Sequence, residues 1–172
     1  MNSFWEPDFD FYEARFENPS EDGVVRVAVF VDLAASKHAP VATHPVRFLV
    51  RVAMLHPRAD GLRSEDEADA LLAAEDTIVE RVTAALDALY LGRVVAEGRA
   101  TFAFYIPRAR HAEAAEAANI VGNVAPYAPE WSCEEDVTWG YYREFLYPDD
   151  KSLAEVLSRR AADRILGVGQ SS

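Results

Sequence analysis

The chain has 172 residues, half of them hydrophobic and 27% charged, which excludes a disordered or low-complexity protein and fits one domain of ordinary size. Asp and Glu number 29 against 17 Lys and Arg, and the formal net charge of −12 disfavours generic binding to nucleic acid or to anionic lipid. A single cysteine, Cys133, permits no internal disulfide, and neither a secretion signal nor a membrane-spanning apolar run is visible. We therefore expect a soluble cytoplasmic protein.

The first 22 residues combine many acidic side chains with large aromatic ones. Six aromatic residues lie between Phe4 and Phe16, and such apolar groups need burial. The segment is predicted to pack on the domain as an edge strand around residues 9–16, before a turn that ends near Gly23. We expect a single domain over residues 1–172, in which this segment (1–22) precedes an α+β core (24–148) and a C-terminal helix and tail (149–172).

Two stretches, residues 24–33 and 46–55, alternate between apolar side chains on one side and mixed side chains on the other. A period of two is typical of β-strands. The pattern predicts two long strands, which we expect to be antiparallel neighbours.

The strongest helix signal covers residues 65–90, where apolar side chains recur at steps of three and four. Ser64 followed by Glu67 is typical of an N-terminal capping box, and the acidic first turn suits the helix dipole. Gly92 stands where a left-handed C-terminal cap is commonly found.

The rest of the chain predicts a hairpin, a second helix, a short strand and further helical segments. They are expected at residues 93–106 (hairpin), 108–121 (alanine-rich helix), 132–137 (strand), 139–147 (helical turns) and 153–166 (last helix). The order strand, helix, strand, strand, helix, strand from residue 46 to 137 predicts an α+β fold. It is a ferredoxin-like, split β-α-β arrangement, an antiparallel sheet with two helices on one face. The extra N-terminal strands have no assigned place in it.

No coherent catalytic or metal-binding set emerges, so we expect no cofactor and no metal. The four histidines lack the short spacing of zinc ligands, and the acids beside Cys133 oppose formation of its thiolate. An alternative function is a small hydrolase that uses Asp136 or Glu135 with His111 or Tyr141.

An aromatic cluster at the end of the core is the more informative feature, and Pro148 ends it. Its members are Trp139, Tyr141, Tyr142, Phe145, Leu146 and Tyr147. At helical spacing Trp139, Tyr142 and either Phe145 or Leu146 share one face. That face either closes the core or anchors a partner, with Tyr141 and Tyr147 exposed in the second case.

Arginines on the predicted strands give a second candidate surface. Arg26, Arg47 and Arg51 are expected beside Phe30 and Leu49 on a sheet face that the helices leave open. Such a face binds RNA bases in some ferredoxin-like domains, but the net charge opposes this. We favour neutralisation of these arginines by the acidic N-terminal segment, in a monomer, or by a second copy, in a homodimer.

The sequence resembles a bacterial family of unknown function, number 695. The resemblance rests on Gly92-Arg93, Gly98-Arg99, the residues Phe102-Ala103-Phe104-Tyr105 and above all the run from Asp136 to Pro148, with its closing Phe-Leu-Tyr-Pro. More distantly, the family is similar to the regulator B of ribonuclease E, a ferredoxin-like protein that binds an enzyme. The resemblance implies a binding role and carries over no catalytic residue.

These observations favour a non-catalytic protein-binding or regulatory module with an unknown protein partner. The predicted partner-binding residues are Trp139, Tyr141, Tyr142, Tyr147, Arg47 and Arg51.

Overall fold

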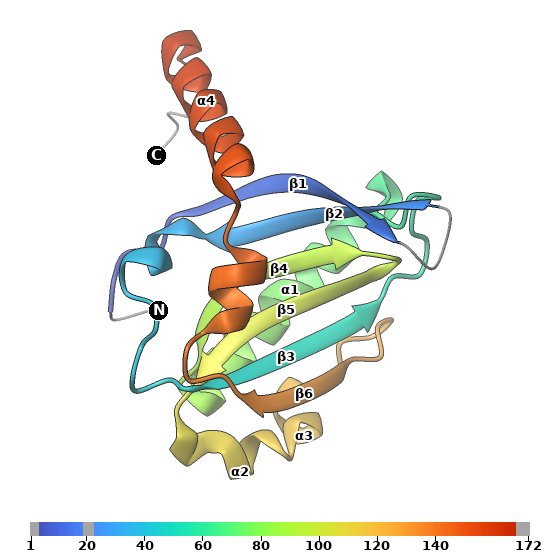
Figure 1. Ribbon diagram of the computed structural model, residues 1–172. Helices are drawn as coiled ribbons and strands as arrows, with labels where there is room; N and C mark the ends of the chain where they lie inside the picture. Colours follow the sequence, from blue (N-terminus) through green and yellow to red (C-terminus); the bar gives the residue numbers. More distant parts are fainter. Residues whose placement is uncertain (1–3, 19–22, 168–172) are drawn as a thin grey trace.

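The computed structural model describes residues 4–18 and 23–167, which form an α+β fold on one antiparallel sheet (Figure 1). Within these residues the sheet has six strands, in the order β1-β2-β4-β5-β3-β6. The strands are β1 (Phe9–Asn18), β2 (Gly23–Asp32), β3 (Val46–Ala53), β4 (Leu89–Ala96), β5 (Arg99–Ile106) and β6 (Glu130–Glu135). The predicted α+β class with an antiparallel sheet is confirmed.

Helical segments lie on both sides of this sheet. The α-helices are α1 (Glu65–Leu86), α2 (His111–Ala114), α3 (Ala117–Val121) and α4 (Asp150–Leu166), and the shorter pieces are the 3-10 turns η1 (Leu33–Lys37) and η2 (Arg108–Arg110) and the π-helix η3 (Tyr141–Leu146). Figure 1 shows α1 behind the sheet, the orange η3 segment in front of it, and α4 extending away from β1. No helix in the described residues has the length and apolar character to cross a membrane.

The N-terminal strands extend the sheet beyond β4. Residues 27–31 of β2 pair with residues 92–96 of β4, and β1 pairs with β2 as the outer strand. The predicted pairing of segments 24–33 and 46–55 is wrong, because β4 and β5 lie between them. Strand β5 of the β4–β5 hairpin pairs with β3. The other edge of β4 is therefore available for pairing with β2. The order of the other strands, β4-β5-β3-β6, is compatible with the split β-α-β prediction.

Gly92 lies inside β4 and does not cap α1, contrary to the prediction. A Cβ atom at this position would lie 2.1 Å from the carbonyl oxygen of Phe30 on β2, so the close approach of the two strands requires glycine. The helix itself ends at Leu86, where Asp87 adopts a left-handed φ of 52°. It ends earlier than predicted because Leu89 and Tyr90 join the sheet.

The start of α1 is fixed by Glu67 and not by the predicted capping box. Ser64 makes no side-chain cap, and its hydroxyl has no hydrogen-bond partner in the described structure. The buried carboxylate of Glu67 accepts hydrogen bonds from the backbone N–H groups of Leu55 (2.9 Å) and His56 (2.5 Å) and from the Tyr127 hydroxyl (2.7 Å). These contacts tie the helix to the end of β3.

The predicted helix over residues 108–121 is divided into η2, α2 and α3. The backbone leaves the helical region at Glu116, with φ −101° and ψ 35°. Ala114 and Ala117 on either side of this break are both buried against the core. Helix propensity differs by less than 1 kcal/mol between ordinary residues, so packing decides the path of an alanine-rich segment.

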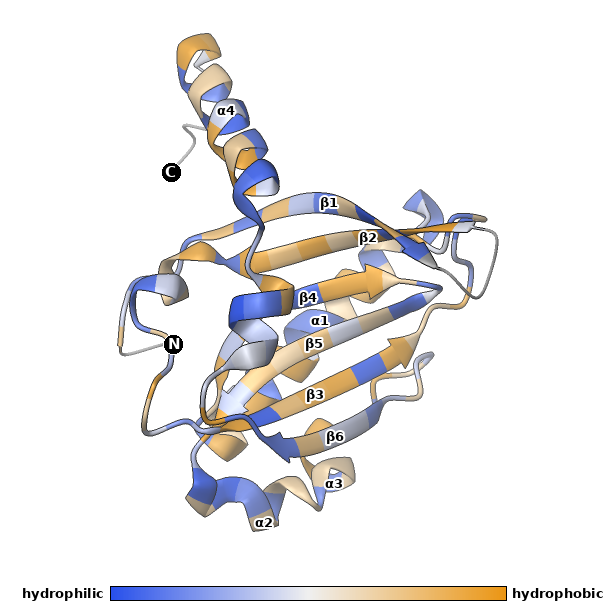
Figure 2. Ribbon diagram, viewed as in Figure 1, coloured by the Kyte–Doolittle hydropathy of each residue, from blue (hydrophilic) through white to orange (hydrophobic). Residues whose placement is uncertain are grey.

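Each face of the sheet carries its own apolar layer, and Figure 2 shows hydrophobic strands with hydrophilic bands interrupting β3. On the face of α1, the buried residues include Phe48, Val50, Ile78, Val82, Phe102 and Phe104. On the opposite face they include Val29, Leu49, Leu91, Tyr105, Trp139, Tyr142 and Leu146. The alternation along each strand therefore supplies two cores.

The N-terminal segment is held by the buried carboxylate of Asp32. It accepts hydrogen bonds from the Trp5 indole (2.7 Å), the Asp8 N–H (2.9 Å) and the Ala34 N–H (3.0 Å). Strand β1 follows at the edge of the sheet, which confirms the predicted edge strand. Asp10 on β1 pairs with Arg159 (2.7 Å) on α4, the helix predicted at residues 153–166.

Candidate functional site

Residues 136–147, here called the covering segment, lie across the face of the sheet opposite α1. Trp139 and Tyr142 are fully buried there, the first stacked on Tyr105 with ring centroids 4.2 Å apart. The Trp139 indole donates to the His44 carbonyl (2.8 Å), and the Tyr142 hydroxyl donates to the Asp32 carbonyl (2.6 Å). Core closure thus accounts for these two members of the predicted partner site. Leu146 is the third buried member, and Phe145 is exposed.

Asp136 anchors the start of the covering segment. Its carboxylate accepts hydrogen bonds from the Tyr105 hydroxyl (2.7 Å) and from the N–H groups of Gly140 (2.8 Å) and Tyr141 (3.1 Å). Burial by itself raises the pKa of Asp136, but these donors and the charge of Arg47 outweigh it and hold the pKa below its ordinary value. All three of these hydrogen bonds stabilise the fold of the covering segment.

The arginines of the predicted basic face lie on two different faces. Phe30 packs between Phe9 and Arg93 on the α1 side, whereas Leu49 belongs to the opposite core. The prediction that one open face carries Phe30 with Leu49, Arg47 and Arg51 is therefore wrong. β2 enters the sheet next to β4, and its register with β4 sets which of its residues face α1.

The N-terminal segment neutralises only part of the basic surface. Glu13 on β1 pairs with Arg26 (3.1 Å), as predicted. Arg47 instead pairs with Glu134 of β6 (2.7 Å), and its guanidinium lies 5.2 Å from the ring centroid of Tyr141. The covering segment, not residues 4–16, shields the apolar centre of this face.

A cavity of about 430 Å³, here called the arginine groove, lies where the covering segment leaves this face of the sheet open. It is lined by Arg51, Val94, Ala96, Glu97, Arg99, Thr101, Tyr141 and Phe145. Two predicted partner residues, Arg51 and Tyr141, meet there. Tyr147 lies elsewhere, beside a smaller cavity with Tyr12 and Ser152.

The groove combines positive charge with aromatic surface. In residues 4–18 and 23–167, neither Arg51 nor Arg99 forms an ion pair or a hydrogen bond through its side chain. Phe145 is 41% exposed, and its ring centroid lies 5.1 Å from that of the half-buried Tyr141. Such an arrangement can hold a carboxylate next to an apolar side chain.

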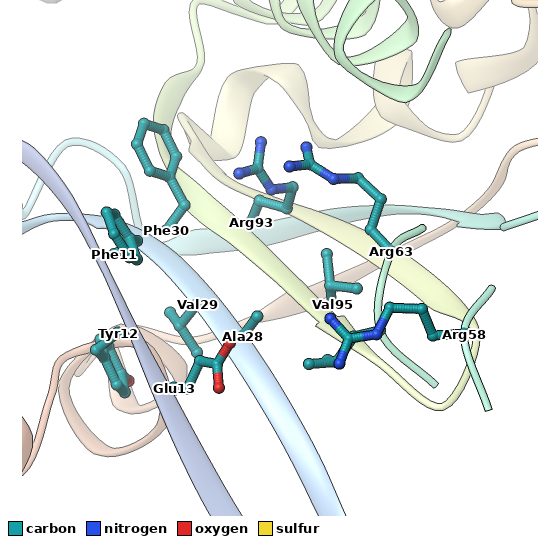
Figure 3. A pocket seen from close by; sticks show the side chains of 11 residues that line it. Phe11, Tyr12, Glu13, Ala28, Val29, Phe30, Arg58, Arg63, Arg93 and Val95 are labelled. Atoms are coloured by element: carbon teal, nitrogen blue, oxygen red, sulfur yellow. The ribbon is translucent and has the colours of Figure 1, made fainter. Parts of the chain in front are cut away.

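A second cavity of about 430 Å³, here called the sheet pocket, opens on the α1 side over β1, β2 and β4 (Figure 3). It is lined by Phe11, Tyr12, Glu13, Ala28, Val29, Phe30, Arg58, Leu62, Arg63, Arg93 and Val95. No residue of α1 lines this pocket, although Glu75 of α1 pairs with Arg93. Figure 3 shows the Arg63 and Arg93 side chains extending to the same side of the pocket.

The residues of the alternative hydrolase site are engaged elsewhere or exposed. Glu135 pairs with Arg108 (2.9 Å), and His111 is exposed at the start of α2. Burial and the charge of Glu134 raise the pKa of the half-buried Cys133 thiol, which opposes a nucleophilic thiolate. The described part of the chain holds no group of three potential metal ligands.

Sequence reasoning missed Arg99, Phe145 and Arg63 as site residues. Arg99 had a signal, because the alternation of β5 places it on the same face as Thr101 and Tyr105. Helical spacing groups Phe145 with Trp139 and Tyr142 and leaves open whether Phe145 or Leu146 is buried, so it does not identify Phe145 as the exposed ring. Arg63 lies in the loop before α1, where no periodicity applies.

Comparison with known proteins gives one match. A family model described as "Family of unknown function (DUF695)" matches residues 21–147, which include the sheet from β2 onward and the whole covering segment. Neither the curated proteins nor the solved structures gave a match.

Proposed function

The chain belongs to the DUF695 family of unknown function, and we propose that it is a non-catalytic binding module that holds an acidic segment of a protein partner in the arginine groove. One observation carries the proposal. Arg51 and Arg99, without acidic partners in the described structure, stand beside aromatic surface in a protein of net charge −12. We place this activity in the cytoplasm, because the single cysteine can form no internal disulfide and disulfides are rare in cytosolic proteins.

The side chains of the groove suit a protein interface. Tyrosine and arginine are enriched among the residues that dominate binding energies, especially where apolar surface surrounds them. Tyr141 is already held against Arg47, so it loses little conformational freedom when a partner binds. Val94 and Ala96 supply the apolar surface below it.

Charge complementarity indicates an acidic occupant. The groove has two arginines and one carboxylate, that of Glu97, and an arginine can hold a carboxylate through two parallel hydrogen bonds. The net charge of the whole protein repels a strongly acidic partner. The expected segment therefore carries one or two carboxylates next to an apolar side chain that contacts Phe145.

Site-specific crosslinking tests the proposal. The photoreactive residue p-benzoylphenylalanine is placed at position 145 in the groove and, in a control protein, at exposed position 72 on α1, and both proteins are irradiated in the cells that produce the natural protein. Crosslinked segments are identified by mass spectrometry. We expect an adduct at position 145 only, on a segment with an Asp or Glu close to the crosslink.

The captured segment is then synthesised and titrated calorimetrically against purified variants. Arg51→Glu and Arg99→Glu are expected to weaken binding at least tenfold, since each replaces an attraction by a repulsion, while Arg63→Gln on the opposite face leaves it unchanged. Absence of a position-specific adduct, a segment without carboxylates, or equal affinities of all variants would overturn the proposal.

A further inference from the structure

We infer that the sheet pocket is a separate binding site for a small monoanion with a planar aromatic ring. The site lies on the opposite face from the arginine groove and does not depend on the function proposed there.

The charges around the sheet pocket leave one positive group unmatched. The ion pairs are Asp60 with Arg26 (3.1 Å) and Arg58 (2.6 Å), Glu13 with Arg26 (3.1 Å), and Glu75 with Arg93. Three carboxylates thus balance three arginines. The fourth arginine, Arg63, has no ion pair or side-chain hydrogen bond with any described residue. A ligand with one negative charge completes the balance.

Arg93 is fixed in position and offers further donors. Its Nη1 group pairs with the buried carboxylate of Glu75, and its guanidinium carbon lies 5.0 Å from the ring centroid of Phe30. A guanidinium has five N–H donors, and the pair with Glu75 engages only those on Nη1. Figure 3 shows that Arg63 reaches toward the same end of the pocket, so an anion placed there meets both side chains.

The floor of the pocket fits a planar apolar group. Ala28 and Val95 are directly paired across β2 and β4, and both line the pocket, so its floor over the sheet consists of small apolar side chains. Leu62, only 4% exposed, and Phe11 on β1, 56% exposed, add further apolar surface to the lining. Small-molecule sites have volumes of roughly 300–1,000 Å³ and a few polar groups among apolar ones, and the cavity of about 430 Å³ matches this description.

Titration calorimetry with 2-naphthoate and 2-naphthamide tests the inference, because the two probes share a ring and differ in charge. The full-length protein is expected to bind 2-naphthoate about tenfold more tightly than the amide, as a charge-assisted hydrogen bond provides. Arg63→Gln should abolish this preference and leave the affinity for 2-naphthamide unchanged. Arg99→Gln, which alters only the arginine groove, should change neither affinity.

A second variant tests whether the ring of the probe lies on the floor of the sheet pocket. Ala28→Leu puts a larger side chain into the floor of the pocket and is expected to weaken both probes at least fivefold, with folding confirmed by an unchanged circular dichroism spectrum. The inference is overturned if neither probe saturates the wild-type protein at millimolar concentration, if both bind it equally, or if the preference survives Arg63→Gln. Since the groove and the pocket are tested with different ligands and lie on opposite faces of the sheet, failure of one proposal leaves the other standing.

Discussion

The two faces of the sheet are held together by different kinds of contact. On the α1 side, Val50, Ile78 and Phe102 are fully buried side chains without polar atoms. On the opposite side, Tyr105 and Trp139 are just as buried, but each has a polar atom in a hydrogen bond to a distant residue. Helix α1 is therefore held mainly by apolar area, supplemented by the hydrogen bonds of Glu67 and Glu75, whereas in the short covering segment the buried rings themselves make the directed bonds that fix its path.

The largest expected effect is the loss of the central ring of the covering segment. Trp139→Ala should lower the free energy of unfolding by about 3–5 kcal/mol, because it removes a fully buried ring and the hydrogen bond to the His44 carbonyl. Urea denaturation measures this. Trp131→Ala, at a ring 37% exposed on β6, is the control and should cost no more than about 1 kcal/mol. Equal costs for both would mean that Trp139 does not hold the covering segment.

A matched pair of small changes sharpens the contrast between the faces. Tyr142→Phe keeps the ring but removes the donor to the buried Asp32 carbonyl, and should cost about 1–3 kcal/mol. Ile78→Val removes one methylene group from the α1 side, with an expected cost of about 0.5–1.5 kcal/mol. Both free energies come from urea titrations at one temperature. If Tyr142→Phe is the milder change, directed bonds are not what distinguishes the covering segment.

The carboxylate of Asp136 makes the covering segment sensitive to acid. Because its pKa is lowered in the folded protein, its contribution to stability is fully present above its ordinary value near 3.8 and is lost as the pH falls through the lower folded value. Asp136→Asn should cost about 1–3 kcal/mol at pH 7, since an amide cannot accept all three hydrogen bonds.

Urea titrations of both proteins between pH 7 and pH 3 check this prediction. The difference in unfolding free energy between wild type and Asp136→Asn should shrink below about pH 4 as the wild-type carboxylate takes up a proton. Other acids with lowered pKa values, such as Asp10 and Glu67, are common to both proteins and cancel in the difference. A difference independent of pH would show that the charge of Asp136 contributes nothing.

The smallest effect is expected at the exposed rim of the same face. Glu134→Gln breaks the ion pair with Arg47, but the glutamate side chain is 66% exposed, so the cost should be about 0–1 kcal/mol. Thermal denaturation at low and high salt measures it, and salt should reduce the cost further. A cost above 2 kcal/mol would indicate that Arg47 holds Tyr141 far more strongly than an exposed pair allows.

Local periodicity was sufficient to predict most of the elements. The alternation along β2 and β3, the apolar stripe of α1 and the burial of Trp139, Tyr142 and Leu146 all follow from which side chains must leave water. The α+β class follows from the order of these elements. The edge strand β1 follows from its aromatic residues, and it pairs with β2; the turn predicted before Gly23 lies outside the described residues.

Only the tertiary structure decided where the strands pair and which surfaces stay open. The place of β2 beside β4 depends on the close approach at Gly92, a contact between residues about 60 apart in the chain. The candidate sites depend on the same strand pairing, because it puts Arg26 on the α1 side of the sheet and leaves Arg47 and Arg51 on the opposite side. Arg51 of β3 and Arg99 of β5 meet on one side, since alternation fixes faces within a strand while only the pairing of strands joins them into a surface. On the other side, the loop before α1 brings Arg63 to the pocket that Arg93 of β4 lines.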